Sequence, residues 1–210
     1  MLYHLQAVKD NLRNREGKRI FYLGEGDRLT DEAKDFLYRE HIEIVAAMQI
    51  KKQDKPEHMT HLNGEILVSK THPRIAFRGA MDSLEAEILL CQLEIPPLEK
   101  PLQEILDLAR KLVACDVLNE PAPEGKLCGL DQEQLRSHSH LPQKFYGQPH
   151  FMPAVSDEKT ILQLNRLRCA VRQAELKAVA ALPERMDIIR ALNRMSSMVY
   201  ILMIREKAGI

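Results

Sequence analysis

The sequence predicts a mainly α-helical protein, a helical bundle preceded by a small α/β lobe. Four long segments after residue 74 place apolar residues at intervals of three and four, the spacing of one helical face. Before residue 51, two short apolar runs flank one amphipathic segment, which is a strand–helix–strand pattern. We therefore expect an α/β lobe over 1–50, a connector with a candidate phosphate-binding loop over 51–73, and the bundle over 74–210.

The composition limits the classes of function. The chain has 210 residues, 45% of them hydrophobic, which is enough to bury a core. Thirty basic residues balance thirty acidic ones with no long block of one sign, so nothing in the charge favours nucleic-acid or membrane-surface binding. The four cysteines stand far apart, no apolar signal segment opens the sequence, and no run could span a bilayer. We expect a protein of the reducing cytoplasm.

The first 50 residues supply the elements of the expected lobe. A short amphipathic segment ends at Gly17, and the apolar run 19–23 follows it as a strand. Thr30 is the expected N-cap of a helix with acidic residues in its first turn, and alternation from His41 predicts a second strand. The Gly-Glu-Gly turn lacks the dinucleotide-binding fingerprint, and the unit is too small for a nucleotide-binding domain.

A cationic cluster precedes the first bundle helix, which we expect to begin near Arg74. Lys70, Arg74 and Arg78 place positive charge at a helix N-terminus. Such charge opposes the helix dipole unless an anion lies there, so the cluster is a candidate anion site. The alternative is a solvated basic loop.

The same helix has two apolar faces. One comprises Phe77, Met81, Leu84, Ile88 and Ile95, and the other comprises Ala86, Leu89 and Leu93. Asp82 falls within the second face. A carboxylate in an apolar sector needs a cationic partner, so we expect one across a helix or subunit contact.

The middle of the chain contains a second helix and a long loop. Pro96 and Pro97 interrupt the chain, and 98–118 again shows helical periodicity. The segment 126–153 is rich in His, Pro and Gly, with a short helix possible at 131–137, and is interpreted as an ordered functional loop. Its histidines at 138 and 140 lack a third metal ligand nearby, so solvated or capping roles are expected.

The third and fourth bundle helices, over 158–182 and 183–207, carry polar groups close to apolar faces. Arg168, Arg172 and Glu175 stand on the buried side of the third helix or at its edge. A solvated ladder of ion pairs is the usual explanation, but desolvated charges need an ion partner or a ligand.

The fourth helix is the most apolar and has a polar line of Asn193, Ser197 and Tyr200. Asn193 is either a core amide that ties two helices together or an amide that faces a ligand.

Four strings resemble the ATP:cob(I)alamin adenosyltransferases, and the ethanolamine-utilisation type more closely than the propanediol-utilisation type. They are T-H-L (60–62) with V-S-K-T-H-P-R-I-A-F-R-G-A-M-D-S-L (68–84), M-P (152–153), R-C-A-V-R-Q-A-E (168–175) and L-N-R-M-S-S (192–197). Residues 18–50 also resemble the N-terminal unit of ethanolamine-type members. The resemblance implies a helical bundle that forms a homo-oligomer with active sites between subunits.

The resemblance also assigns roles to the polar groups. Asp82 and Arg168 match a pair that forms an intersubunit salt bridge beside the ATP site. Arg172, Glu175 and Asn193 match positions that contact ATP. These are the residues that periodicity places in or beside apolar faces, so both lines of reasoning point to them.

Three features depart from the family patterns. The glycine-rich phosphate loop of the propanediol type is missing, so Lys70, Arg74 and Arg78 would have to replace it. The cysteine-rich motif of some ethanolamine-type relatives is absent, which argues against bound iron or zinc. His150 and Phe151 lie near the place of the phenylalanine that crowds the lower face of cobalamin, and Phe151 is therefore a candidate cobalamin contact.

The implied reaction is attack of the cobalt of cob(I)alamin on the 5′-carbon of ATP, with Mg²⁺ assisting the leaving triphosphate. The resemblance further implies a role in ethanolamine breakdown, transfer of the product to an adenosylcobalamin-dependent lyase, and association with a bacterial microcompartment. Two alternatives stay open. One is a non-catalytic escort protein that holds adenosylcobalamin, and the other is a purely structural helical oligomer, which the polar groups near apolar faces disfavour.

Overall fold

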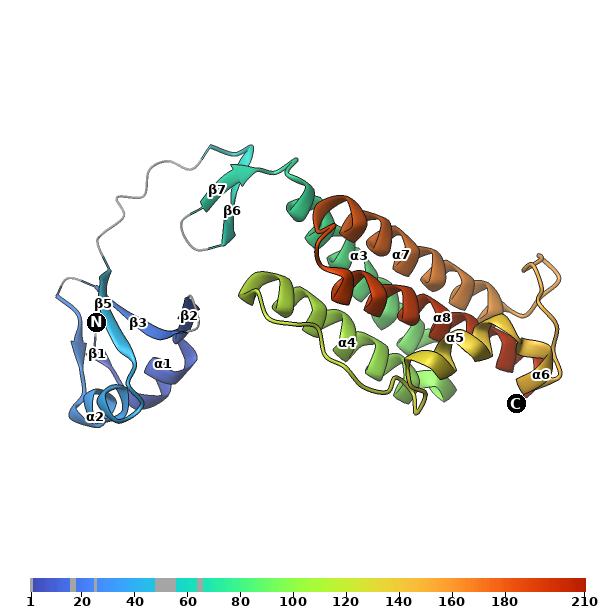
Figure 1. Ribbon diagram of the computed structural model, residues 1–210, viewed down its shortest axis with the longest axis horizontal. Helices are drawn as coiled ribbons and strands as arrows, with labels where there is room; N and C mark the ends of the chain where they lie inside the picture. Colours follow the sequence, from blue (N-terminus) through green and yellow to red (C-terminus); the bar gives the residue numbers. More distant parts are fainter. Residues whose placement is uncertain (1, 16–17, 25, 48–55, 64–65) are drawn as a thin grey trace. The chain divides into compact units, whose positions relative to one another are not determined.

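The computed structural model describes residues 2–15, 18–24, 26–47, 56–63 and 66–210 (Figure 1). The chain divides into two compact units, Met1–Glu57 and His58–Ile210. Most of the charged connector, 51–55, lies outside the described residues.

The first unit is a small α/β lobe with the expected strand–helix–strand order. Its elements are β1 (Leu2–Tyr3), α1 (Leu5–Asp10), β2 (Arg13–Arg15), β3 (Lys18–Gly24), β4 (Arg28–Leu29), α2 (Asp31–Arg39) and β5 (Glu43–Ala47). Strand β3 pairs antiparallel with β2 and parallel with β5, while β1 pairs parallel with β4. Thr30 caps α2 as predicted, because its Oγ1 accepts a hydrogen bond from the Ala33 amide at 3.4 Å. A separate apolar core around Phe21 and Leu37 holds the lobe together.

The second unit begins with a β-hairpin that the sequence pattern did not predict. Strands β6 (Met59–Asn63) and β7 (Ile66–Ser69) pair antiparallel in the segment interpreted as connector and loop. The Lys70 amide extends this pairing by donating to the His58 carbonyl at 2.8 Å. Part of the candidate phosphate-binding loop is therefore a hairpin that leads into the first bundle helix.

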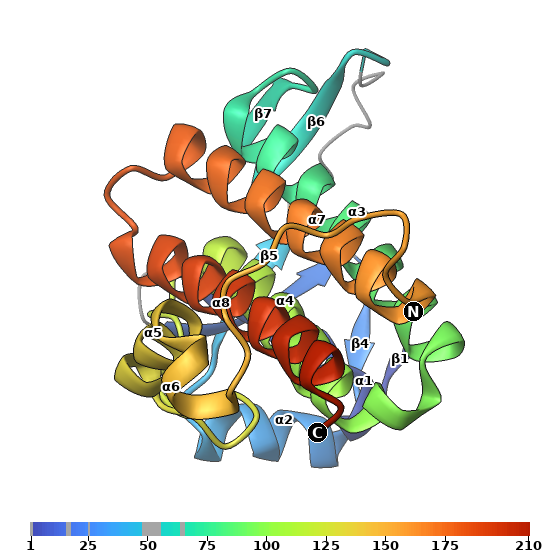
Figure 2. The ribbon, with the colours of Figure 1, turned by 90° about the vertical axis from the view of Figure 1, so that its right-hand side faces the viewer.

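Four long helices form the bundle, and α7 packs against both α3 and α8 (Figures 1 and 2). They are α3 (Pro73–Glu94), α4 (Glu99–Leu118), α7 (Lys159–Ala181) and α8 (Met186–Ala208), with a 3₁₀ turn at Pro96–Leu98. The loop segment holds two short helices, α5 (Gln132–His140) and α6 (Pro142–Tyr146), and both pack on α8. A capping box starts α5, because Asp131 and Gln134 each bond the other's backbone amide.

Helix α8 starts later than predicted. Pro183 was expected in its first turn, but the helix begins at Met186. The reason is the conformation of Arg185, whose amide closes a turn to the Leu182 carbonyl and whose guanidinium bonds Asp187 and the Glu120 carbonyl.

The two apolar faces of α3 have different surroundings. The predicted core face, from Phe77 to Ile88, is fully buried. The second face is exposed within the bundle, with Leu89 47% and Leu93 77% accessible, so the described residues of the second unit do not cover it. Among the described residues, no helix is long and apolar enough to cross a bilayer.

Candidate functional site

Several polar side chains lie along the contact between α7 and α8. They are Arg168, Arg172 and Glu175 on α7 and Asn193, Ser197 and Tyr200 on α8, and together we call them the α7–α8 seam. Spacings of three and four keep each set on one side of its helix. The two helices lie side by side (Figures 1 and 2), so the sets meet along the bundle.

One end of the seam is a hydrogen-bonded chain of three side chains. Asn193 Nδ2 donates to Glu175 Oε1 at 2.9 Å, and Asn193 Oδ1 accepts from Arg194 Nη1 at 2.8 Å. All three residues are half-buried. Asn193 therefore ties α7 to α8, the first of its two expected roles. The bonds leave Glu175 Oε2 and one Nδ2 proton of Asn193 for other partners.

The other end of the seam is an aromatic contact. The Arg168 guanidinium lies 5.2 Å from the Tyr200 ring centroid, at the distance of a cation–π interaction. Tyr200 OH lies 3.0 Å from His150 Nδ1, and His150 Nε2 lies 3.1 Å from the His140 carbonyl oxygen. Because a carbonyl can only accept, Nε2 carries the proton and Nδ1 accepts from the tyrosine. These bonds fix the loop before α7 against α8.

Phe151 lies on this fixed loop. Its ring centroid is 6.3 Å from that of Tyr200, and Lys207 Nζ lies 5.8 Å from the Phe151 ring. Phe151 is half-buried and packs against the edge of the bundle core. The predicted cobalamin contact thus adjoins the arginine end of the seam.

Three of the predicted site residues have no partner in the described parts of the chain. Arg172 and Lys70 are exposed and make no side-chain hydrogen bond or ion pair there. Asp82 is exposed on α3 and forms no ion pair with Arg168 within the chain. These charges are free to meet a ligand or a second subunit.

The structure gives Arg74 and Arg78 an ion partner within the chain. Both bind the carboxylate of Asp116, which is fully buried: Arg74 Nη2 lies 2.6 Å from Oδ1 and Arg78 Nε lies 2.8 Å from Oδ2. Arg78 Nη1 also donates to the Leu62 carbonyl at 2.5 Å. One carboxylate of the chain thus pairs with two of the three cations, and both guanidinium groups bond within the bundle. Sequence reasoning missed Asp116, although it falls four residues after the buried Leu112.

One histidine of the loop, His138, packs against aromatic side chains. His138 stacks on Phe145 at 3.8 Å between centroids and lies 2.8 Å from the hydroxyl of Tyr146. Over the described ranges, no group of three or more His, Cys, Asp and Glu side chains is arranged to hold a metal ion.

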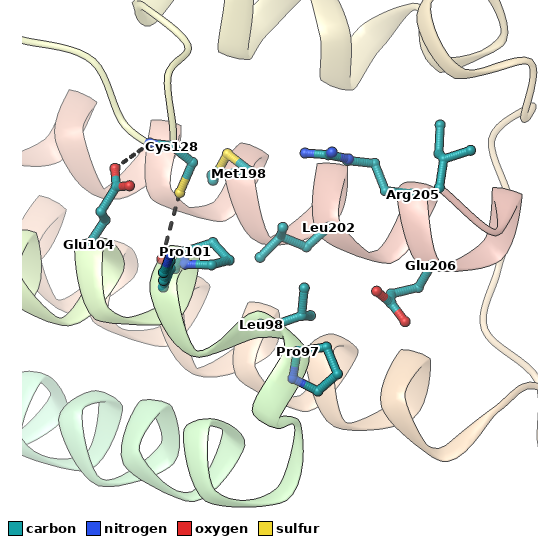
Figure 3. Close-up of a pocket in the computed structure, with 11 residues that line it drawn as sticks. Pro97, Leu98, Pro101, Glu104, Cys128, Met198, Leu202, Arg205 and Glu206 are labelled. Carbon is teal, nitrogen blue, oxygen red and sulfur yellow. Dashed lines mark hydrogen bonds between the residues drawn. The ribbon is translucent and has the colours of Figure 1, made fainter.

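Two hollows lie outside the seam. One, of about 340 Å³, separates the start of α4 from the end of α8, with Leu98 facing Leu202 (Figure 3). Cys128 lines it, and burial raises the pKa of this thiol to about 12, so it is not a thiolate nucleophile. The other hollow, of about 270 Å³, lies between α4 and α8 and is lined in part by Arg194.

Known proteins share this chain's sequence pattern and fold. The family model for cobalamin adenosyltransferase matches residues 50–206. The chain is 34% identical over 161 residues to the corrinoid adenosyltransferase EutT of Salmonella typhimurium, a match covering 73% of this chain and 60% of that protein. It is 35% identical over 157 residues to EutT of Escherichia coli, covering 71% and 59%. The chain thus spans about 60% of the length of these curated relatives.

Solved structures give the same fold. Two variants of a PduO-type ATP:corrinoid adenosyltransferase from Lactobacillus reuteri, each complexed with cobalamin and ATP, match with TM-scores of 0.57 and 0.56 at 20% identity. The matches cover 77% of this chain and 92% and 95% of the two solved chains. At this identity the likeness concerns the fold alone. The family model, however, spans the whole bundle and the seam, and the chain belongs to the cobalamin adenosyltransferase family.

Proposed function

We propose that this chain transfers the 5′-deoxyadenosyl group of ATP to cob(I)alamin. A cobalt–carbon bond forms at the 5′-carbon while the carbon–oxygen bond to the triphosphate breaks, and triphosphate leaves with that electron pair. The observation that carries the proposal is that the family match contains the whole α7–α8 seam, where polar groups unusual for a helix contact gather.

The seam residues divide the work of holding ATP. Arg172 is exposed and unpartnered in the described chain, and its planar guanidinium can bind two phosphate oxygens at once. Glu175 and Asn193 fix one another and keep a free acceptor and a free donor for the nucleoside. Since the metal of the substrate is the nucleophile, the protein needs no serine, cysteine or histidine base. Its tasks are to align the 5′-carbon and to stabilise the leaving triphosphate.

Mg²⁺ fits this scheme as a companion of the triphosphate. No cluster of protein ligands for a metal occurs in the described residues, and Mg²⁺ commonly binds through one or two carboxylates plus substrate phosphates. The free Oε2 of Glu175 is the carboxylate oxygen that the seam offers.

The cobalamin would lie beside the loop that His150 attaches to α8. Phe151 on this loop is the proposed contact, because the bond between His150 and Tyr200 holds it next to the Arg168 end of the seam. A loop held by the bonds of His150 positions an apolar ring at little entropic cost on binding.

The active unit in this proposal is a homo-oligomer with sites between subunits. Asp82 and Arg168 lack carboxylate–guanidinium partners within the described chain, and the exposed Leu89 and Leu93 share the helix of Asp82. A second subunit would pair the charges and cover the apolar face together. In the cell, we place the protein in the cytoplasm in ethanolamine breakdown, with transfer of adenosylcobalamin to a lyase and association with a microcompartment.

One observation favours an escort protein instead. Of the three cations proposed to replace the glycine-rich phosphate loop, Arg74 and Arg78 are bound to Asp116, which leaves Lys70. An anaerobic reaction with ATP and chemically reduced cobalamin separates the two functions. The transferase forms adenosylcobalamin and triphosphate in equal amounts, whereas an escort binds added adenosylcobalamin and releases no triphosphate from ATP.

A further inference from the structure

The β6–β7 hairpin needs contacts with the helices to keep its shape, because an isolated two-stranded hairpin is at best marginally stable in water. The side chain of Leu62 on β6 is buried, whereas Ile66 and Leu67 on β7 are 54% and 38% exposed. The hairpin is therefore attached to the bundle through β6.

One arginine makes this attachment. Arg78 Nη1 donates to the Leu62 carbonyl at 2.5 Å, and in the described part of the chain no other hydrogen bond links β6 or β7 to a helix of the bundle. Arg78 Nε donates in turn to Asp116 Oδ2 at 2.8 Å. The fully buried Asp116 is itself held by Arg74, whose Nε and Nη2 both donate to its Oδ1. A single guanidinium thus connects α4 to the hairpin.

The bonding of Arg78 is that of a positioning residue. Two of its nitrogens, Nε and Nη1, donate to acceptors of the chain. The third, Nη2, is buried and has no hydrogen-bond partner among the described residues. None of the three nitrogens is therefore both unbonded and exposed. Any effect of Arg78 on a ligand would pass through the hairpin that it holds.

Lys70 is the charged group that the hairpin base carries. Its amide donates to the His58 carbonyl at 2.8 Å, and the next turn is closed by the bond from the His72 amide to the Ser69 carbonyl at 2.9 Å. The Lys70 side chain is exposed and makes no hydrogen bond or ion pair with the described residues. The position of its ammonium group therefore follows the position of the hairpin.

We propose that Arg78, held by Asp116, is a positioning residue that fixes the hairpin so that Lys70 reaches the triphosphate of ATP. The inference rests on the proposed adenosyl transfer, in which Lys70 is the cation left to bind phosphate. An arginine suits this role because its planar fork bonds two acceptors in fixed directions, whereas a lysine ammonium is a point charge without that span.

The test is a double-mutant cycle on ATP binding with Arg78→Lys and Lys70→Gln. Arg78→Lys keeps a cation beside Asp116 but loses the span to Leu62, so the protein should fold with a loosened hairpin. Calorimetry without cobalamin should show that each single variant binds ATP about tenfold more weakly, the loss expected for one charge-assisted contact. In the Lys70→Gln background, Arg78→Lys should cause no further loss, because the charge that it positions is gone.

Two measurements separate this role from general destabilisation. Amide hydrogen exchange at Lys70, whose N–H bonds the His58 carbonyl, should be faster in Arg78→Lys. In anaerobic steady-state assays, KM for ATP should rise while KM for cobalamin stays unchanged. Arg110→Lys is the matched control, because Arg110 Nε joins α4 to Glu85 of α3 at 2.9 Å in an ion pair that does not involve the hairpin. It should leave all these values as in the wild type.

Additive losses in the double variant would overturn the proposal, because Arg78 would then act on ATP independently of Lys70. Unchanged hydrogen exchange at Lys70, or equal loss of ATP affinity in Arg110→Lys, would overturn it as well. If Lys70→Gln binds ATP as tightly as a wild-type protein that forms adenosylcobalamin, this inference fails and the proposed function stands. If the wild-type protein forms no adenosylcobalamin, the proposed function fails, whatever the titrations show.

Discussion

Replacement of Asp116 by asparagine should destabilise the bundle far more than removal of an exposed charge. Asp116 is fully buried and binds Arg74 and Arg78, whose side chains are 26% and 17% exposed. The asparagine side chain would keep the shape of the aspartate but leave two partly buried guanidinium groups without an anion. Breaking a buried ion pair costs about 3–5 kcal/mol, so the melting temperature should fall by roughly 6–20 °C.

Thermal and urea denaturation of the Asp116→Asn protein measure this loss, with Glu124→Gln as the control. Glu124 is exposed and unpartnered in the described chain, so its substitution removes the same charge at little cost. Arg74→Ala should likewise lower stability more than ATP affinity. The reasoning fails if Asp116→Asn is as stable as Glu124→Gln while Arg74→Ala chiefly weakens ATP binding, because Arg74 would then be a phosphate ligand.

Three further perturbations test other contacts. Asp82→Ala and Arg168→Ala should each weaken the oligomer as measured by sedimentation, and the double variant should weaken it by less than the sum of the two single losses. Additive losses would show that the two side chains are not partners. The hydrogen bond from Arg185 is the main reason that the pKa of Asp187 is lower in the folded protein than in the unfolded chain. The ionised Asp187 therefore stabilises the fold above pH ~4, and this stabilisation is lost as the pH falls through the folded-state pKa. Asp187→Asn should therefore make acid unfolding shallower, and an unchanged profile would contradict this. Tyr200→Phe should lower the free energy of unfolding by about 1 kcal/mol and speed amide hydrogen exchange around His150. Unchanged exchange would show that the hydrogen bond between Tyr200 and His150 does not fix the loop.

The long helices could be predicted because their buried apolar residues recur at helical spacing. Phe77 and Leu192, for example, lie on faces that periodicity identifies, and both are fully buried. The hairpin at 59–69 was missed because its strands are short and mix polar with apolar residues. The Asn-Gly pair at 63–64, between two short segments that each contain apolar residues, was the available signal.

The site was harder to predict than the fold, because its partners come from distant segments. Polar residues near apolar faces pointed to Glu175 and Asn193, and the structure shows that these two side chains bond each other. The same reasoning could not supply the partner of Arg74, because Asp116 is 42 positions away and belongs to another helix. It also did not single out Arg194, since a lone arginine beside an asparagine has no periodic signal of its own.

The most direct test of the proposed function is the anaerobic rate of adenosylcobalamin formation in the Arg172→Ala protein, beside Lys177→Ala. Both residues are exposed on α7 and unpartnered in the described chain, but Arg172 alone belongs to the seam. Loss of a guanidinium–phosphate contact worth about 1.5–3 kcal/mol should reduce kcat/KM for ATP roughly 10- to 150-fold, while Lys177→Ala keeps the wild-type rate. Equal rates in the two variants, or no adenosylcobalamin from the wild-type protein, would contradict adenosyl transfer at the α7–α8 seam.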